Sequence, residues 1–279
     1  MDSKHIHIVG CLPRSGTTLM TEVMTNCFDI DAYTEHEQSI FREYPEPYQI
    51  LCTKNPNDIK RIQFPLKVNP NLYVIYLLRD PRDAISSRSH KNNQQGNTIW
   101  GSLQDWKQHQ AIAENLSDNA HFITVKYEDL VTEPDSVQAK LMQQLPFLKR
   151  KVKFSEYHTV AKPSKKSKDA LGGVRPITPK SVGTWRNNKP FLKAQIAAYG
   201  DISHKLIELG YEENMQWFGE LQNVEADNSD EPNPKNSARK LLWHKWFTIP
   251  RRCLMYWLSC STIIGPILSK IRHFLRGNF

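Results

Sequence analysis

The stretch HIVGCLPRSGTTLM, residues 7–20, decides the fold that we expect for this chain. An apolar run from Ile6 to Val9 predicts a short buried strand, and a turn from Gly10 to Gly16 follows it. A helical pattern then begins at Thr17. This order can hold an anion, because unpaired backbone N–H groups and the positive end of the helix dipole point at the ligand. The stretch therefore predicts an anion-binding loop, with a purely structural strand–helix turn as the alternative.

Side chains of the same loop add hydrogen-bond donors for an anion: Arg14, Ser15, Thr17 and Thr18. The ATP/GTP-binding loop has the pattern G-x-x-x-x-G-K-[ST], and this stretch does not match it. Five residues rather than four separate Gly10 from Gly16, and Thr17 occupies the position of the lysine. We therefore expect a P-loop-like anion site that does not bind a magnesium nucleotide in the usual way.

Composition narrows the class of protein. With 279 residues, of which 39% are hydrophobic, the chain suits one α/β domain with a real core and an appendage. The five cysteines are odd in number and form no C-x-x-C pair, so neither a disulfide framework nor a zinc site is expected. A reducing, cytoplasmic location fits this cysteine usage. Because the first strand begins within ten residues of Met1, we expect no cleavable signal and no N-terminal anchor.

The net charge of +8 is concentrated toward the C-terminus. No acid follows Glu231, and nine of the 37 Lys and Arg residues lie there, which leaves 28 basic against 29 acidic residues in 1–231. The body of the protein is therefore close to neutral. Composition gives little support to nucleic-acid binding.

Alternating strand and helix patterns predict a three-layer parallel α/β sheet. After the first strand, further strands are expected over Tyr48–Cys52, Leu72–Leu78 and Phe122–Tyr127. Helices are expected over Thr17–Phe28, Thr98–Leu116, Ser136–Leu145 and Phe191–Leu209. Ligands of such sheets bind at the carboxyl ends of the strands. We therefore expect the polar residues that follow the strands to face one crevice: Arg14, Lys54, Arg79 and Tyr127.

A second anion signal, RDPRDAISS at 79–87, follows the strand over 72–78. Arg79 lies at the strand tip, Pro81 suits the first turn of a helix, and Ser86 and Ser87 come later in that helix. The alternative is that the charged residues of this segment pair with one another on the surface. Two anion sites at the ends of two strands predict a ligand with two separated anionic groups.

Four motifs in this order resemble the sulfotransferase family: PRSGTTL (13–19), RDPRDAISS (79–87), YEDL (127–130) and S-x-G-x-W (181–185). The resemblance spans about residues 6–215. It implies a sulfotransferase architecture and the donor 3′-phosphoadenosine-5′-phosphosulfate (PAPS), which leaves as 3′-phosphoadenosine-5′-phosphate (PAP). In that family the first loop holds the 5′-phosphosulfate, which here implies Arg14, Ser15, Gly16, Thr17 and Thr18.

The same resemblance assigns the other end of the donor. In the family, the Arg of the second motif and the Ser eight residues later hold the 3′-phosphate, and here these are Arg79 and Ser87. Tyr127 is similar to the family's tyrosine near the nucleotide. Ser181 is similar to the serine of its late loop.

Within the family, the pattern is most similar to the tyrosylprotein sulfotransferases and their bacterial relatives. Glu35 lies 21 residues after Arg14, and LCTKNP (51–56) places Lys54 at the branch's lysine. The segment TEHE (34–37) departs from the usual Gly-Glu-Glu-Thr, so Glu35, His36 and Glu37 compete for one role. The N-terminal membrane anchor of the animal Golgi enzymes is not expected here either.

The chemistry of sulfuryl transfer calls for these residue types. As in phosphoryl transfer, the attacking and leaving oxygens lie in line, and catalysis is mostly positioning and charge stabilisation. A neutral hydroxyl acceptor needs a base, and we assign Glu35 to it. Charge that builds on the leaving oxygen needs fixed cations, for which Arg14 and Lys54 are the candidates, helped by Ser181. A sulfuryl group carries less charge than a phosphoryl group, and the sequence has no carboxylate cluster, so no metal is expected.

Residues 149–190 are expected to shape the acceptor side. The segments KRKVK (149–153) and KPSKKSK (162–168) are basic, and Gly172–Gly173 follows them. One interpretation is a solvated loop. The other is a lid that attracts an anionic acceptor, such as an acidic glycan or an acidic peptide.

We expect three parts in the chain: a catalytic domain over 1–222, a polar linker over 223–238 and a basic, Trp-rich amphipathic tail over 239–279. The uncharged stretch 253–269 is at the lower length limit for a spanning helix, and Gly265–Pro266 interrupts it. An apolar centre between basic clusters predicts peripheral attachment to an anionic membrane surface. Packing on the body and true spanning are the alternatives.

Three functions are compatible with these patterns. The first is transfer of the sulfuryl group to a hydroxyl of a glycan or glycoconjugate, including a lipid-linked one, which suits the tail. The second is a tyrosylprotein sulfotransferase that acts on acidic peptide segments. The third is a P-loop-type nucleotide kinase or switch, against which the missing lysine and the second anion motif speak.

Overall fold

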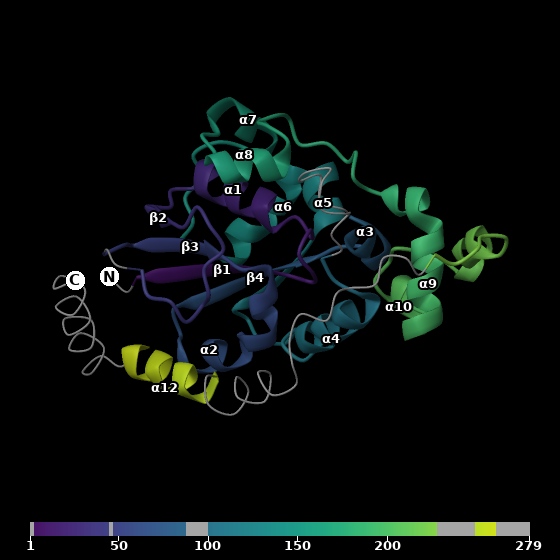
Figure 1. Cartoon of the computed structure of the whole chain (residues 1–279). Helices are drawn as coiled ribbons and strands as arrows, with labels where there is room; N and C mark the ends of the chain where they lie inside the picture. Colours follow the sequence, from purple (N-terminus) through teal and green to yellow (C-terminus); the bar gives the residue numbers. More distant parts are fainter. Residues whose placement is uncertain (1–2, 45–46, 88–99, 228–248, 261–279) are drawn as a thin grey trace.

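The computed structural model describes residues 3–44, 47–87, 100–227 and 249–260. Within them, five strands form one sheet in the order β2-β3-β1-β4-β5 (Figure 1). The strands are β1 (Lys4–Gly10), β2 (Ala32–Tyr33), β3 (Ile50–Lys54), β4 (Leu72–Leu78) and β5 (Phe122–Lys126). Every neighbouring pair is parallel. The predicted parallel α/β fold is therefore confirmed.

Helices cover both faces of the sheet and its carboxyl end (Figure 1). On one face lie α1 (Thr17–Cys27), α5 (Tyr127–Thr132), α6 (Pro134–Gln144), α7 (Tyr157–Val160) and α8 (Lys165–Leu171). On the other lie α2 (Gln63–Val68), α4 (Leu103–Glu114) and α12 (Ile249–Cys260). Near the carboxyl end of the sheet lie α3 (Pro81–Ser86), α9 (Lys189–Tyr199) and α10 (Ser203–Glu208). Short 3-10 turns are η1 (Pro56–Arg61), η2 (Phe154–Glu156), η3 (Thr184–Asn188) and η4 (Met215–Leu221).

The sheet separates two apolar cores. Successive residues of β4 alternate between them: Ile75 and Leu77 pack with the α1 and α6 side, whereas Val74 and Tyr76 pack with the α4 and α9 side. A strand buried on both faces is expected to be apolar throughout. This explains why the uninterrupted run over 72–78 was a sound strand signal.

The strand order places the site. The chain passes from β1 to one side of the sheet, forms β2 and β3 there, and then crosses β1 to form β4 and β5. Ligands of such sheets bind at the carboxyl ends of the strands, where the order reverses. The register pairs Ile8 with Lys54 and Gly10 with Leu77, so β1, β3 and β4 end close to the same level. The residues that follow these three strands therefore share one edge of the sheet.

Two helix predictions need correction. A single helix over Phe191–Leu209 is wrong, because α9 ends at Tyr199 and α10 begins at Ser203. Gly200 has a φ of 84° and Asp201 accepts hydrogen bonds from the next two backbone N–H groups, so the chain turns between them. The helix predicted over 98–116 is shorter: α4 begins after Ser102, whose hydroxyl takes part in a capping box. Residues 98 and 99 lie outside the described residues.

The described part of the predicted tail is α12, since 228–248 and 261–279 lie outside the described residues. It packs against α2. The Tyr256 hydroxyl accepts a hydrogen bond of 2.9 Å from Asn69 Nδ2, and its ring meets Phe41 edge to face at 5.8 Å. Leu254 and Trp257 are each 54% exposed on the same helix. Across the described ranges, every helix is too short or too polar to cross a membrane.

Candidate active site

The loop after β1 turns sharply into α1. Arg14 is the one non-glycine residue with a positive φ (77°) in the described chain, and Gly16 has a φ of 96°. A Cβ atom at Gly16 would run into the ring of Tyr127. Glycine is therefore required at this position both by the backbone conformation and by the close approach of the ring. The loop brings the start of α1 directly against the end of β5.

Arg79, at the tip of β4, holds this loop from the other side. It is only 5% exposed. Its Nη1 donates to the carbonyl of Arg14 at 2.7 Å, and its Nη2 donates to the carbonyl of Ser181, also at 2.7 Å. Its guanidinium lies 4.4 Å from the centre of the Tyr127 ring. Three of the four residues that were predicted to face one crevice therefore lie together: Arg14, Arg79 and Tyr127. Beside them lies the late loop, the S-x-G-x-W segment over 181–185.

The guanidinium groups of Arg14 and Arg79 concentrate positive charge in the crevice at the carboxyl ends of β1 and β4. Nε of Arg14 donates to the Ser87 hydroxyl at 3.2 Å, so the first loop reaches the second motif. Burial, and then the nearby Arg79, lower the pKa of Arg14, although an arginine stays charged at neutral pH. Neither arginine forms an ion pair with a described carboxylate. The electrostatics of the crevice therefore favour an anionic ligand.

Several buried polar atoms around the crevice lack partners within the described chain: Ser15 Oγ, Ser86 Oγ and Arg79 Nε. Such atoms are uncommon, because an unsatisfied buried donor costs free energy. All three can donate a hydrogen bond to an oxyanion. The residues present therefore fit a ligand with phosphate or sulfate groups. The described residues hold no cluster of three or more His, Cys, Asp or Glu side chains suited to a metal.

Lys54 connects the anion loop with a neighbouring pocket. Its Nζ donates to the Thr18 hydroxyl, in the first turn of α1, at 2.7 Å, and the side chain is buried. Burial lowers the pKa of Lys54, while the carboxylates of Glu37 and Glu22 oppose this shift. Lys54, the fourth of the predicted strand-tip residues, is therefore also next to the loop, bonded to a residue two positions after Gly16.

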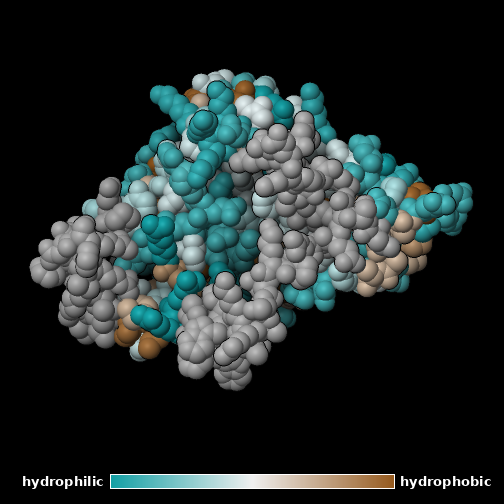
Figure 2. Space-filling model, viewed as in Figure 1, coloured by the Kyte–Doolittle hydropathy of each residue, from teal (hydrophilic) through white to brown (hydrophobic). Residues whose placement is uncertain are grey.

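The pocket beside Lys54 is formed by four segments of the chain. They are the polar side of α1, the end of β2 with the segment after it, the end of β3 and the start of α8 with the residues before it: Thr21, Glu22, Thr25, Asn26, Tyr33, Thr34, Glu35, Lys54, Lys162, Ser164 and Ser167. In Figure 2 the centre of the visible face is hydrophilic, and brown residues lie at its rim.

Glu35 and Lys54 line this pocket together. The backbone N–H groups of Thr34 and Gln38 donate to the carbonyls of Cys52 and Lys54 at 3.2 and 2.9 Å, so the segment runs along β3. The three competing candidates, Glu35, His36 and Glu37, are all exposed. Among them, Glu35 lines the pocket, whereas Glu37 is the one that acts electrostatically on Lys54.

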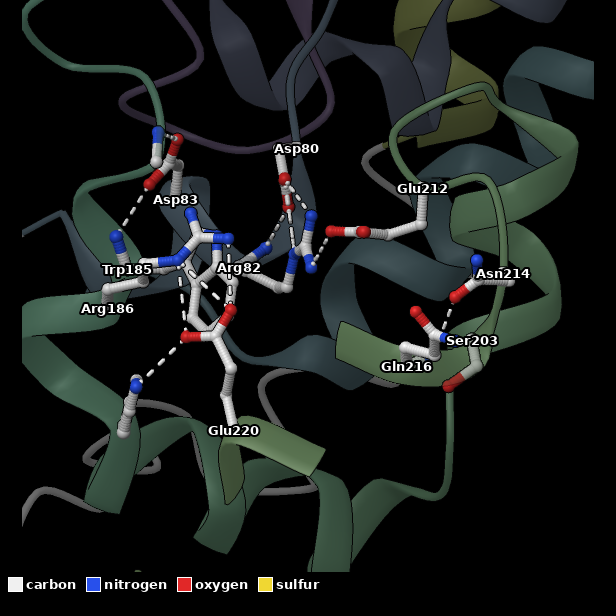
Figure 3. A network of polar contacts seen from close by, with 12 residues as sticks. Asp80, Arg82, Asp83, Trp185, Arg186, Ser203, Glu212, Asn214, Gln216 and Glu220 are labelled. Atoms are coloured by element: carbon white, nitrogen blue, oxygen red, sulfur yellow. Dashed lines mark hydrogen bonds and ion pairs between the residues drawn. The ribbon is translucent and has the colours of Figure 1, made fainter. Parts of the chain in front are cut away.

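Asp83 positions the late loop and was not singled out by the sequence (Figure 3). Its carboxylate accepts hydrogen bonds from the backbone N–H groups of Gly183 (2.7 Å) and Trp185 (2.8 Å) and from the Thr184 hydroxyl (3.1 Å). Asp83 therefore holds the late loop in the position in which the Ser181 carbonyl accepts the hydrogen bond from Arg79. The contact that Ser181 makes with Arg79 is therefore through its backbone. The signal for Asp83 was its place within RDPRD, where a surface role was the simpler interpretation.

Arg82 and Asp80 do pair with each other, as the alternative interpretation of the second motif holds, but the pair is buried. Arg82 Nη2 lies 2.7 Å from Asp80 Oδ2, and Arg82 also pairs with Glu212. Its guanidinium stacks over the rings of Trp185 and Trp217 at 4.5 and 4.8 Å. This network joins α3 to η3 and to the segment after α10 (Figure 3).

Glu128, in the YEDL motif, supports the same RDPRD segment from the first turn of α5. Its carboxylate accepts hydrogen bonds from the backbone N–H of Asp80 (3.0 Å) and from the Tyr211 hydroxyl (3.2 Å). Burial raises the pKa of Glu128. Sequence reasoning named Tyr127 in this motif and missed its neighbour, whose task is to fix the start of the second motif.

Comparison with known families matches less than half of the chain, and the matched part begins after the anion loop. Residues 30–147 match the model of the sulfotransferase family. The predicted enzyme class is confirmed. The match does not single out the tyrosylprotein branch, and it leaves the acceptor open. No curated protein matches the chain.

Several solved structures are similar to this chain. The mouse sulfotransferase SULT7A1, complexed with PAP, is 18% identical with a TM-score of 0.44 over 75% of this chain and 89% of that one. A sulfotransferase domain from the curacin biosynthetic pathway is 14% identical with a TM-score of 0.41 over 67% and 91%. Retinol dehydratase, in complex with androsterone and PAP, is 15% identical with a TM-score of 0.39 over 82% and 84%.

Proposed function

We propose that this sulfotransferase moves the sulfuryl group of PAPS to a hydroxyl of a glycan or glycoconjugate. The observation that carries the proposal is the position of Lys54. Lys54 donates a hydrogen bond to Thr18, in the first turn of α1 at the anion loop, and it also lines the neighbouring pocket. The two sites therefore share one cation. A reaction that joins an anionic donor to a polar acceptor needs such a junction.

The crevice around Arg79 suits the two ends of the donor. We assign the 5′-phosphosulfate to the loop at the start of α1: Arg14, Ser15, Gly16, Thr17 and Thr18. The unpartnered hydroxyl of Ser15 and the helix N-terminus support this assignment. We assign the 3′-phosphate to Arg79 and Ser87, with Tyr127 and Ser181 beside the nucleotide. The cation–π contact between Arg79 and Tyr127 supports a shared role.

The chain's own residues then have separate tasks. PAPS supplies the sulfuryl group and leaves as PAP. Glu35 accepts the proton of the attacking hydroxyl, for which a carboxylate typically contributes about 10²–10⁴-fold. Lys54 and Arg14, helped by Ser181, hold the negative charge of the leaving oxygen in a site that is already formed.

The pocket lining favours a sugar over a tyrosyl side chain. Its eleven residues include no aliphatic side chain, and Tyr33 is its only aromatic one. A phenol ring is bound best by apolar and aromatic walls, whereas sugar hydroxyls need donors and acceptors. Hydroxyl, amide, carboxylate and ammonium groups are what this pocket offers.

Calorimetry with PAP and with ATP tests the donor. We expect PAP to bind at least tenfold more tightly, because the second anion site has no counterpart in ATP. Equal binding would favour the nucleotide kinase or switch. Incubation with labelled PAPS and separated lipid, glycan and protein fractions of a cell envelope then tests the acceptor. Label in glycan or glycolipid supports the proposal, and label confined to protein tyrosines would replace it.

We further propose that the tail attaches the enzyme peripherally to an anionic membrane surface. Arg251, Arg252, Leu254 and Trp257 are exposed on α12, which is the combination that interfacial helices use. Tyr256 holds the helix on the body. Sedimentation with anionic vesicles, with and without residues 239–279, tests this. Equal pelleting of both forms would contradict attachment through the tail.

A further inference from the structure

The side of α1 that faces the pocket is polar along its whole length. Thr18, Glu22 and Asn26 are spaced by four residues and so lie on one face of the helix. The residues between them on the other face, Met24 among them, belong to the core. Thr18 is the partner of Lys54, so this polar face leads directly from the donor loop into the pocket.

Glu22 stands out on this face because its carboxylate is buried but poorly partnered. The residue is only 7% exposed, and α7 and α8 pack against its helix. Its carboxylate receives one long hydrogen bond, from Asn26 Nδ2 at 3.4 Å. Among the described residues no Lys, Arg or His forms an ion pair with it. Burying a carboxylate without strong partners is costly, so its position needs an explanation.

We propose that Glu22 binds the acceptor, and that it selects a neutral, polyhydroxylated one. This inference rests on the proposed function and names the acceptor class of the same pocket. The carboxylate accepts hydrogen bonds from hydroxyls next to the one that is sulfated. These bonds place the reacting hydroxyl between Glu35 and Lys54, which line the same pocket.

The charge of the pocket explains why the acceptor is neutral. A carboxylate has only acceptor atoms, so its ligand must bring donors, and neighbouring sugar hydroxyls bring two. The lining holds two carboxylates, Glu22 and Glu35, and two ammonium groups, Lys54 and Lys162, so its formal charge is balanced and gives an anionic acceptor no net attraction. The lysines of α8 are exposed, so solvent screens their attraction more than it screens the buried Glu22.

The test measures transfer from labelled PAPS to neutral di- and trisaccharides, to their uronic acid counterparts and to acidic tyrosine peptides. Wild type, Glu22→Gln and Glu22→Ala are compared. We expect the wild type to use a neutral sugar best. Each variant should raise the KM for that sugar about tenfold or more, leave kcat within about threefold, and leave PAP affinity unchanged. The preference over the uronic acid should shrink most in Glu22→Gln, which keeps the shape and removes the charge.

Two control variants separate the alternatives. Glu208→Gln removes an exposed carboxylate far from the pocket, which pairs with Lys205, and should change no constant. Glu37→Gln removes a charge that acts on Lys54 but does not line the pocket. If Glu22 acted only through Lys54, Glu37→Gln would reproduce its effect on KM, and the proposal would be overturned. Circular dichroism confirms that each variant is folded.

The outcomes distinguish the proposal from the function on which it rests. Failure of the wild type to bind PAP would reject the sulfotransferase mechanism itself. PAP binding without transfer to any neutral sugar, or with better transfer to the uronic acids or peptides, would overturn the role of Glu22 alone. An unchanged KM in both Glu22 variants would do the same.

Discussion

The donor crevice and the acceptor pocket meet at Lys54 but are built differently. Around Arg79 the side chains are buried, and the bonds that hold the crevice run to backbone groups: two carbonyls for Arg79 and two N–H groups for Asp83. Around Glu35 the pocket is lined by side chains from four segments, and three of these side chains are exposed: Tyr33, Glu35 and Lys162. The fold itself therefore specifies the donor end, whereas individual side chains specify the acceptor end.

This difference has a practical meaning for variants. A change in the donor crevice disturbs several loops together, because each polar group there holds more than one segment. A change in the pocket removes one contact and leaves the crevice intact. Binding of PAP and turnover should therefore respond separately to substitutions at the two places.

Glu35→Ala is the substitution with the largest expected effect on turnover. We expect kcat to fall at least about a hundredfold, because the group proposed to take the proton of the attacking hydroxyl is removed. PAP affinity, measured by calorimetry, should stay near normal, since Glu35 is an exposed residue of the acceptor pocket and not part of the donor crevice. Glu37→Ala is the matched control and should lower kcat less. Normal turnover in Glu35→Ala would remove this residue from the mechanism.

Arg79→Ala should have its main effect on the donor instead. We expect PAP affinity to fall about 10–100-fold, because charge-assisted hydrogen bonds to the 3′-phosphate are lost and the two loops are no longer held. Adenosine 5′-phosphosulfate, which lacks the 3′-phosphate, should lose less affinity than PAP in the same titration. Equal losses for both nucleotides would show that Arg79 shapes the crevice without contacting the 3′-phosphate.

Lys54→Arg tests, through the pH dependence of kcat/KM, whether the charge of Lys54 serves both the donor crevice and the acceptor pocket. Burial lowers the pKa of Lys54, so its proton is lost at a lower pH than that of an ordinary lysine. In the wild type, kcat/KM for PAPS should therefore fall on an alkaline limb that lies below the usual lysine range. Arginine keeps its charge at these pH values, so the limb should disappear in Lys54→Arg. A limb that stays in place belongs to another group.

Replacing Lys165, Lys166 and Lys168 with Gln should give the smallest effect. All three are exposed on α8, while Lys162, Ser164 and Ser167 are the residues of that region that line the pocket. We expect a rise in acceptor KM of at most about threefold at low ionic strength, gone at about 0.5 M salt. A larger rise that survives high salt would mean that these lysines touch the acceptor, as a lid over the pocket would.

The sequence predicted the donor crevice more completely than the pocket. Arg14 and Arg79 follow strands directly, and residues that follow parallel strands meet at one edge of the sheet whatever the loops do. Lys54 was predicted on the same ground. The exact contact of Ser181 could not be predicted, because a backbone carbonyl carries no sequence signal.

Glu22 and Asp83 show what the sequence could not reveal. A Glu in an amphipathic helix normally faces solvent, and Glu22 fits that pattern. Only the packing of α7 and α8, more than a hundred residues later in the chain, buries it. Asp83 lies in a charged cluster whose pairing depends on the late loop. The break at Gly200 was missed for a related reason, since a helical pattern can continue through a glycine at modest cost.

The contact between α12 and the body determines the distance from the donor crevice to any surface that α12 touches. The Tyr256 hydroxyl accepts a hydrogen bond from Asn69, which lies just before β4 begins, whereas Arg79 follows the end of β4. The seven residues of that strand span about 23 Å at roughly 3.3 Å each, so helix and crevice lie at opposite ends of the sheet (Figure 1). Under the membrane attachment proposed above, a glycolipid acceptor in the same surface would need a headgroup several sugars long to reach the proposed catalytic groups. Short headgroups stay out of range.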